Sequence, residues 1–305
     1  MLKFTHSSKS HIGSVRKANE DAFGERALAN GAHVFVVCDG MGGHKGGEIA
    51  SNLAVNSILN YLSKANLTNI KKDISDAIAF ANSIVFEESK KDSALLGMGT
   101  TAVVLLIYKD SFYTGHAGDS RLYLLSDNQL HQLTKDHSIV QELMDVGQIN
   151  AEDQKDHPLK NRITRAIGID SAIDAEVSDR IFQVKKNDCF LLCSDGLSNM
   201  LNDSEIAKII SSESNINTRV DQLIASALMV DGKDNITACL IEITESSNAE
   251  TILSNNKSSI QNEQRETSFK TNDSFDKVAS KKSNWGFLSI VFLAIAIIIY
   301  IILFH

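Results

Sequence analysis

Apolar and polar positions along the chain fall into blocks of two different periods. Residues 34–38, VFVVC, form a short apolar run bounded by turn residues, which predicts a buried strand. In residues 47–62, GEIASNLAVNSILNYL, apolar side chains such as Ile49, Leu53 and Ile58 recur at helical spacing. A second helix is expected from about Ile70 to Ser89. The first part of the chain therefore predicts a strand followed by two helices.

A series of strand patterns follows. Four short apolar runs are separated by turn residues, at 100–108, 111–118, 120–126 and 130–134, and this meander predicts antiparallel strands. Residues 189–196, CFLLCSDG, form another strand pattern that ends in Asp-Gly, and residues 234–243 form the closing strand. Helical patterns at 204–212, with Asp203 as the expected N-cap, and at 219–230 lie between them. Blocks of strands and blocks of helices predict an α+β fold.

The C-terminal part of the chain has a different pattern. Residues 245–284 are rich in Ser, Asn, Lys and Glu without an apolar period, which predicts a flexible polar linker. Residues 285–304, WGFLSIVFLAIAIIIYIILF, carry no charge and match the length that crosses a hydrocarbon core of ~30 Å. A buried core helix is the alternative, but nothing follows that would cover it. Lys281 and Lys282 precede the span and place the bulk of the protein on the cytoplasmic side. We therefore expect a domain at 1–244, a linker and a single transmembrane helix that anchors the domain to a membrane.

Composition narrows the possible partners. The formal net charge is −8 and no basic stripe offsets it, so nucleic acid is not an expected partner. The four cysteines lie in apolar runs without a CxxC pair or a histidine at metal spacing. The pattern therefore favours cysteines that are small buried side chains in a reduced compartment over zinc binding, a disulfide or a nucleophilic role.

Acidic residues occur repeatedly where apolar runs end. Asp39, Asp195 and Asp234 each adjoin a strand pattern and precede Gly or Asn, Asp119 lies at a bend, and Glu20 and Asp21 follow Asn19. Turn formation explains any one of them, because Asp-Gly is a common turn dipeptide. Together they can converge into an all-oxygen cluster, which would repel itself unless cations occupied it. Such ligands select Mg²⁺ or Mn²⁺ rather than zinc.

A metal cluster of this kind suits phosphoester hydrolysis. Two ions roughly 4 Å apart can bridge and deprotonate a water, which gives a nucleophile at neutral pH. Arg16 can form a bidentate pair with phosphate, and His44, in the glycine-rich segment 38–47, is the candidate acid for the leaving oxygen. Taken alone, Arg16 is more readily interpreted as a surface charge, and His44 as a solvent-facing loop residue.

Seven short motifs occur in one order along the chain. They are VRKANEDA, VVCDGMGGHKGGEIAS, GTTAVV, HAGDSRLYLL, HPLKNRITRAIG, LLCSDGL and GKDNIT. The series resembles that of the metal-dependent protein phosphatases of type 2C, the PPM family, and its single-domain bacterial branch above all. The resemblance spans residues 7–244 and no core motif position departs from it.

The resemblance implies a fold and a set of roles. The fold would be a central β-sandwich of two antiparallel sheets flanked by helices. Asp39 would bridge two Mg²⁺ or Mn²⁺ ions, the carbonyl of Gly40 would bind one of them, and the remaining ligands would come from Asp195 and Asp234, with Glu20 and Asp21 holding water. Asp119 would bind a third, weaker ion, Arg16 the phosphate, and His44 would act as general acid. Residues 147–163 would form a flap.

The expected function is therefore hydrolysis of phosphoserine and phosphothreonine in proteins at a membrane, by direct attack of the bridging hydroxide. Expected partners are phosphoproteins, among them a Ser/Thr kinase and its membrane-associated substrates. Two alternatives remain at this point. One is a binding or scaffold module with a phosphatase fold, and the other is a hydrolase of small phosphoesters.

Overall fold

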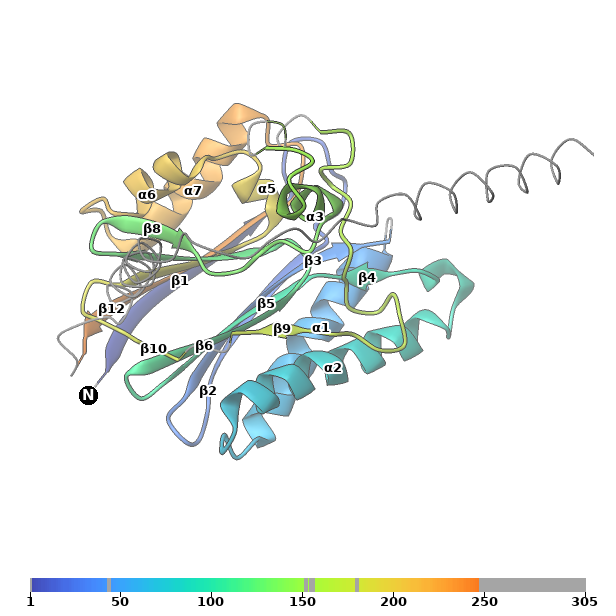
Figure 1. Ribbon diagram of the computed structural model, residues 1–305, viewed down its shortest axis with the longest axis horizontal. Helices are drawn as coiled ribbons and strands as arrows, with labels where there is room; N and C mark the ends of the chain where they lie inside the picture. The colour runs from blue at the N-terminus through green and yellow to red at the C-terminus, as the bar shows by residue number, and fades with distance from the viewer. Residues whose placement is uncertain (1, 43–44, 151–152, 154–156, 179–180, 247–305) are drawn as a thin grey trace, which may run out of the picture. The chain divides into compact units, whose positions relative to one another are not determined.

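Two antiparallel sheets stacked face to face form the centre of the structure, with helices on both outer faces (Figure 1). The computed structural model describes residues 2–42, 45–150, 153, 157–178 and 181–246. The last described strand ends at Glu245. The predicted linker, apart from residues 245 and 246, and the predicted membrane span lie outside the described residues, as does His44. No helix within the described ranges is both long and apolar enough to cross a bilayer.

The first sheet has five strands in the order β1-β12-β11-β7-β8. It joins the N-terminal strand to the last one, so the two ends of the domain lie side by side. Its strands are β1 (Lys3–His11), β12 (Ile236–Glu245), β11 (Cys189–Cys193), β7 (Arg121–Ser126) and β8 (Gln129–Gln132).

The second sheet has the order β10-β6-β5-β3-β2, with β4 paired to β3 and β9 paired to β6. Its strands are β2 (Asp21–Ala27), β3 (His33–Met41), β4 (Gly99–Thr100), β5 (Ala102–Tyr108), β6 (Ser111–Ala117), β9 (Glu176–Val177) and β10 (Phe182–Gln183). The edge strand β1 of the first sheet also contacts β2, which is the edge strand of the second.

Helices cover the outer faces of both sheets. The long helices α1 (Gly46–Lys64) and α2 (Ile70–Ser89) pack against β2, β3 and β6 of the second sheet, and α6 and α7 pack against the first (Figure 1). The remaining helical segments are the 3₁₀ turn η1 (Ser93–Leu95), α3 (Ile139–Asp145), α5 (Asp195–Ser198), α6 (Asp203–Ile210) and α7 (Ile216–Val230).

The period-2 pattern of β3 shows how the layers are made. Val34 and Val36 belong to the core between the second sheet and the long helices, whereas Phe35 and Val37 belong to the core between the two sheets. A strand buried on both faces must be apolar at every position, which is why VFVVC reads as an unbroken apolar run. The predicted α+β fold with two antiparallel sheets and flanking helices is confirmed.

Three local expectations need correction. Strands β1 and β2 were not predicted, because an edge strand such as KFTHSSKSH has no fully buried position and carries polar residues at all but one of its positions. The N-cap of α6 is Asn202, whose side chain accepts from the backbone N–H of Glu205, and not Asp203. Asp195 begins the short helix α5 and does not end β11.

Candidate active site

A cavity of about 250 Å³ opens where strand ends of both sheets meet. Four aspartates that are far apart in sequence line it. Asp39 lies near the end of β3, Asp119 in the bend between β6 and β7, Asp195 directly after β11, and Asp234 just before β12. Arg16, Glu20 and Gly40 line the same cavity, so the structure brings together seven of the nine predicted site residues. Of the other two, Asp21 lies directly behind it and His44 is outside the described residues.

Hydrogen bonds of its own backbone groups fix the position of Asp39. Its N–H donates to Thr101 Oγ1 at 2.9 Å, and its carbonyl accepts from Thr100 Oγ1 at 2.9 Å. Strand β3 is paired on both sides at this level, with β2 and with β4. A carboxylate on such a strand keeps its direction without support from a flexible loop.

Asp21 is buried directly opposite Asp39 in the ladder of β2 and β3. Its Oδ2 accepts from Ser194 Oγ at 2.7 Å, directly after β11, and from Thr237 Oγ1 at 2.6 Å, on β12. Its Oδ1 is buried and makes no hydrogen bond to any described residue. Burial, above all, raises the pKa of Asp21 to about 7 against the pull of these two hydroxyls.

The acidic side chains disfavour one another's ionised forms. Burial and the neighbouring carboxylates of Asp21 and Asp195 hold the pKa of Asp39 well above its ordinary value. Burial, followed by the charge of Asp195, raises the pKa of Asp119 to about 8. Burial and Asp234 likewise raise the pKa of Asp195. A cluster of this kind either keeps protons or takes up cations.

The residues present fit hard divalent ions. The acidic side chains at the cavity offer only carboxylate oxygens as ligand atoms for a metal ion. Two buried carboxylate oxygens, Oδ1 of Asp21 and Oε1 of Glu20, have no hydrogen-bond partner among the described residues. Oxygen donors of this kind are what Mg²⁺ and Mn²⁺ prefer. The backbone is also close-packed at Gly40, where a Cβ would lie 2.2 Å from the carbonyl oxygen of Gly47.

Arg16 reaches the rim from the loop between β1 and β2. Asn235 holds this loop, because its Nδ2 donates to the carbonyls of Ile12 and Ala18 and its Oδ1 accepts from the N–H of Glu20. The guanidinium of Arg16 is half exposed and donates to Asp234 Oδ2 at 2.9 Å. This hydrogen bond raises the pKa of Arg16, so the group is a permanent cation beside the cavity.

A buried ion pair supports the bend that carries Asp119. Arg121 Nε donates to Asp136 Oδ1 at 2.9 Å and Arg121 Nη2 donates to Asp136 Oδ2 at 2.6 Å. His137, next in the chain, donates its backbone N–H to the carbonyl of Gly118. The bend between β6 and β7 is therefore tied to the segment that precedes α3.

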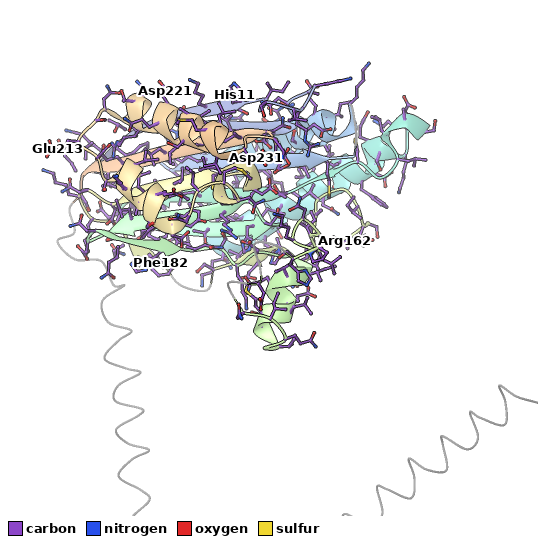
Figure 2. The ribbon with its side chains drawn as sticks, turned by 90° about the horizontal axis from the view of Figure 1, so that it is seen from above. His11, Arg162, Phe182, Glu213, Asp221 and Asp231 are labelled. Atoms are coloured by element: carbon purple, nitrogen blue, oxygen red, sulfur yellow. The ribbon has the colours of Figure 1, made fainter. Side chains whose placement is uncertain are left out.

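The predicted flap, residues 147–163, is described in part. Asn161 and Ile163 line the cavity, and the carbonyl of Arg162 accepts from the N–H of Ile139 at 2.9 Å. Figure 2 shows Arg162 at the base of the α3 segment, which projects from the sandwich. Residues 151–152 and 154–156 of the flap lie outside the described residues.

The sequence did not single out the hydroxyl and amide groups that hold the acidic side chains. Thr101, Ser194, Asn235 and Thr237 act on residues far from them in the chain. Each lies within one of the seven motifs, either in GTTAVV or within three residues of a predicted acidic residue, and that proximity was the available signal.

Comparison with known proteins gives a consistent result. The sequence model of the Protein phosphatase 2C family matches residues 9–231. The serine/threonine phosphatase stp of Listeria welshimeri is 36% identical over 238 residues, which cover 75% of this chain and 92% of that protein. The structure of the S. agalactiae serine/threonine phosphatase matches with a TM-score of 0.75 at 31% identity, over 80% of this chain and 100% of that one. The catalytic domain of the phosphatase PstP, solved in complex with two manganese ions, matches with a TM-score of 0.69 at 30% identity, over 80% and 100% of the two chains.

Proposed function

The chain belongs to the PPM, or type 2C, family and is a bacterial metal-dependent protein serine/threonine phosphatase, and from this premise we propose that it hydrolyses phosphoserine and phosphothreonine at the cavity of Asp39, Asp195 and Asp234 while anchored to the cytoplasmic face of a membrane. The observation that supports the catalytic part is the convergence of four aspartates on one cavity with Arg16 at its rim.

The proposed metal ligands are the oxygens that line the cavity. Asp39 would bridge two Mg²⁺ or Mn²⁺ ions, with Asp195, Asp234 and the carbonyl of Gly40 as further ligands. Asp119 would hold a third, weaker ion. When bound, such ions neutralise charge on the phosphoryl group and lower the pKa of the attacking water. The two manganese ions in the related PstP structure favour two ions here.

The protein itself binds and orients the phosphoryl group. Arg16 is a planar cation whose loop is fixed by Asn235, and a guanidinium suits two phosphate oxygens at once. Glu20 and Asp21 would hold water at the edge of the cavity, and the hydroxyls of Ser194 and Thr237 fix the direction of the Asp21 carboxylate. His44 is the proposed general acid for the leaving alkoxide, on the strength of its place in the motif GMGGHKGG.

The anchor is proposed from the sequence of residues 285–304 and the lysines that precede it. A linker of about 40 residues between β12 and the span would give the domain a reach of roughly 35 Å. Substrates within that reach are membrane-associated phosphoproteins, and a Ser/Thr kinase and its targets are the proposed partners.

The test of the catalytic proposal is phosphate release from a phosphothreonine peptide by the full-length chain in detergent. Wild type, Asp39→Asn and the control Asp221→Asn are compared with EDTA, Mg²⁺ or Mn²⁺. Asp221 lies on α7 in an exposed pair with Lys9, so its loss should leave turnover unchanged (Figure 2). We expect metal-dependent release that only Asp39→Asn lacks. Full turnover by Asp39→Asn would refute the role of this residue, and turnover of free phosphothreonine in preference to the peptide would identify a hydrolase of small phosphoesters.

The anchor has its own test. A chain that ends before residue 281 should appear in the soluble fraction and should dephosphorylate membrane-associated substrates less than the full-length chain does. The peptide assay serves as the control, because the truncation should leave it unchanged. Full dephosphorylation of the same membrane substrates by the truncated chain would show that the anchor is dispensable.

A further inference from the structure

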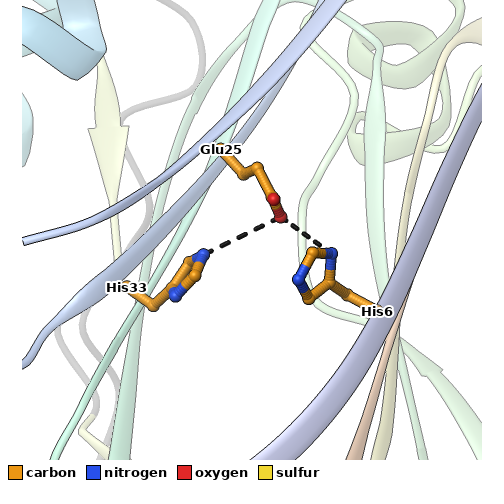
Figure 3. A group of neighbouring side chains, drawn as sticks. All are labelled: His6, Glu25 and His33. Carbon is orange, nitrogen blue, oxygen red and sulfur yellow. Dashed lines mark ion pairs between the residues drawn. The ribbon is translucent and has the colours of Figure 1, made fainter.

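Two histidines and a glutamate meet at the edge of the sandwich where β1, β2 and β3 lie together (Figure 3). Oε2 of Glu25 lies 2.8 Å from Nδ1 of His6 and 3.7 Å from Nε2 of His33. The three potential ligand atoms all lie within 4.8 Å of one another. None of these residues belongs to the cavity described above.

The cluster spans the two sheets. His6 comes from β1 of the first sheet, whereas Glu25 and His33 come from β2 and β3 of the second. Alternate residues of a strand lie on the same face, so His33 lies on the face of β3 that Phe35 and Val37 turn toward the other sheet. The cluster therefore occupies positions of the intersheet face at its open edge, where an apolar side chain would otherwise extend the core.

One nitrogen in the cluster makes no hydrogen bond to a described residue. Nε2 of His33 is buried, and it makes no hydrogen bond to any described residue, since Glu25 is beyond hydrogen-bond distance. The ring of His33 stacks on Phe35, with centroids 4.7 Å apart, and Phe4 meets it edge-on at 5.1 Å. Burial lowers the pKa of His33, which favours the neutral imidazole that binds metal ions. A buried ring nitrogen without a hydrogen bond is costly unless something binds it.

The spacing of the three atoms suits a tetrahedral ion. Ligand atoms at about 2.05 Å from a tetrahedral zinc stand about 3.3 Å apart. The two distances to Glu25, 2.8 and 3.7 Å, lie on either side of that value, and the two imidazole nitrogens lie within 4.8 Å of each other, so rotamer adjustments would bring the three atoms to this spacing. Two imidazoles and one carboxylate, with a fourth position open to water, form a known zinc ligand set.

We propose that His6, Glu25 and His33 bind one Zn²⁺ ion that links the two sheets of the sandwich. The ion would lie apart from the catalytic cavity, since His33 lies six residues before Asp39 on β3, or about 20 Å along an extended strand. Its ligand chemistry also differs from that of the catalytic cavity: imidazole nitrogen favours zinc, whereas an all-oxygen cluster favours Mg²⁺ and Mn²⁺. The inference does not depend on the proposed catalytic roles.

The test is zinc binding to the full-length chain in detergent, measured by competition with a chromophoric chelator in excess Mg²⁺, which keeps the oxygen cluster occupied. We expect one equivalent of zinc and a rise in the thermal midpoint with zinc concentration. Glu25→Gln and His33→Gln should each weaken zinc binding by more than the ~10–100-fold that loss of an outer-shell partner costs. His131→Gln, on β8 at the far edge of the first sheet, is the matched control and should bind as wild type does.

A second measurement reports geometry. Co²⁺ in the site should give the intense visible absorption of a tetrahedral ion with nitrogen ligands, and Glu25→Gln should lose it. Glu25 is partly exposed, with 40% of its side-chain surface accessible, so this variant will fold even where His33→Gln does not. The proposal is overturned if wild type takes no zinc from the chelator, or if Glu25→Gln binds zinc and cobalt as wild type does. In that case the cluster is a hydrogen-bonded contact of His6 with Glu25.

Discussion

Asp21 and Asp39 stand directly opposite each other in the antiparallel ladder of β2 and β3. Like charges at such a position destabilise a sheet, because the side chains of opposed residues lie on the same face about 5 Å apart. The chain offsets part of this cost with the hydroxyls of Ser194 and Thr237, which donate to Asp21. The remainder is relieved by protons or by cations. Removal of metal should therefore reveal the repulsion.

In EDTA the free energy of unfolding should fall as pH rises between about 4 and 7. Burial raises the pKa of Asp21 to about 7, against about 4 in an unfolded chain, so the folded state keeps this proton over a range where the unfolded state has lost it. Stability then decreases with pH, because the unfolded state binds fewer protons. Below pH 4 and above the folded pKa this contribution no longer changes.

Urea unfolding at a series of pH values, in EDTA and in excess Mg²⁺, measures this slope. Mg²⁺ should flatten or reverse it, since bound cations favour the ionised carboxylates. Asp21→Asn should reduce the slope in EDTA. Equal slopes in EDTA and Mg²⁺ would mean that the acidic cluster and the metal are not linked.

Thr237→Val should weaken metal binding without removing a proposed ligand. Thr237 donates to Oδ2 of Asp21 at 2.6 Å, and the loss of a group that orients a carboxylate at a metal site typically costs ~10–100-fold in affinity. Val has the shape of Thr, so the fold should persist. A Mn²⁺ titration by calorimetry and by phosphatase activity measures the change, and the maximal rate at saturating Mn²⁺ should fall less than the affinity. Thr218→Val on α7 is the control. An unchanged Mn²⁺ affinity would show that this hydroxyl does not position Asp21.

The apolar strands and the long helices could be predicted from sequence because their patterns are local. The run VFVVC, the helix over residues 70–89 and the acidic residues at strand ends all follow from short stretches of the chain. The strands β1 and β2 could not be predicted in this way. Their polar positions are paired only because β1 joins β12, more than 200 residues away, and β2 joins β3.

The same limit applies to the side chains around the acidic cluster. Nothing in the sequence near Asp21 indicates that Ser194 and Thr237 donate to it, since the contact exists only once the two sheets are stacked. The group of His6, Glu25 and His33 was hidden for the same reason, because it lies on strands of both sheets. The motif series nevertheless led to the cavity residues, because five of the seven motifs carry an acidic residue next to a strand.

Gly40→Ala should destabilise the domain. A Cβ at this position would lie 2.2 Å from the carbonyl oxygen of Gly47 and 2.5 Å from that of Glu20, and backbone atoms cannot rotate away. Overpacking of a close site costs about 1–3 kcal/mol. Urea unfolding measures the loss, and Gly31→Ala, which has nothing within 4 Å but a positive φ of 86°, serves as a control for backbone strain alone. A loss at Gly40 no larger than at Gly31 would show that the first turn of α1 and the residue before β2 can move away from β3.

Arg121→Met should lower the free energy of unfolding more than Lys9→Met does, although each variant removes one partner of an ion pair. Arg121 and Asp136 are buried, with 16% and 7% of their side-chain surfaces exposed, and removal of one partner leaves the other charge without compensation. We expect a loss of about 3–5 kcal/mol in the free energy of unfolding. Lys9→Met breaks the pair with Asp221 at the same 2.6 Å separation, but both of those side chains are about half exposed, and such pairs contribute less than about 1 kcal/mol.

The double variant Arg121→Met/Asp136→Leu should recover much of the loss, because it leaves no unpaired charge. Equal losses for Arg121→Met and Lys9→Met, by urea unfolding in Mg²⁺, would mean that water reaches the Arg121–Asp136 pair and that it does not fix the bend that carries Asp119.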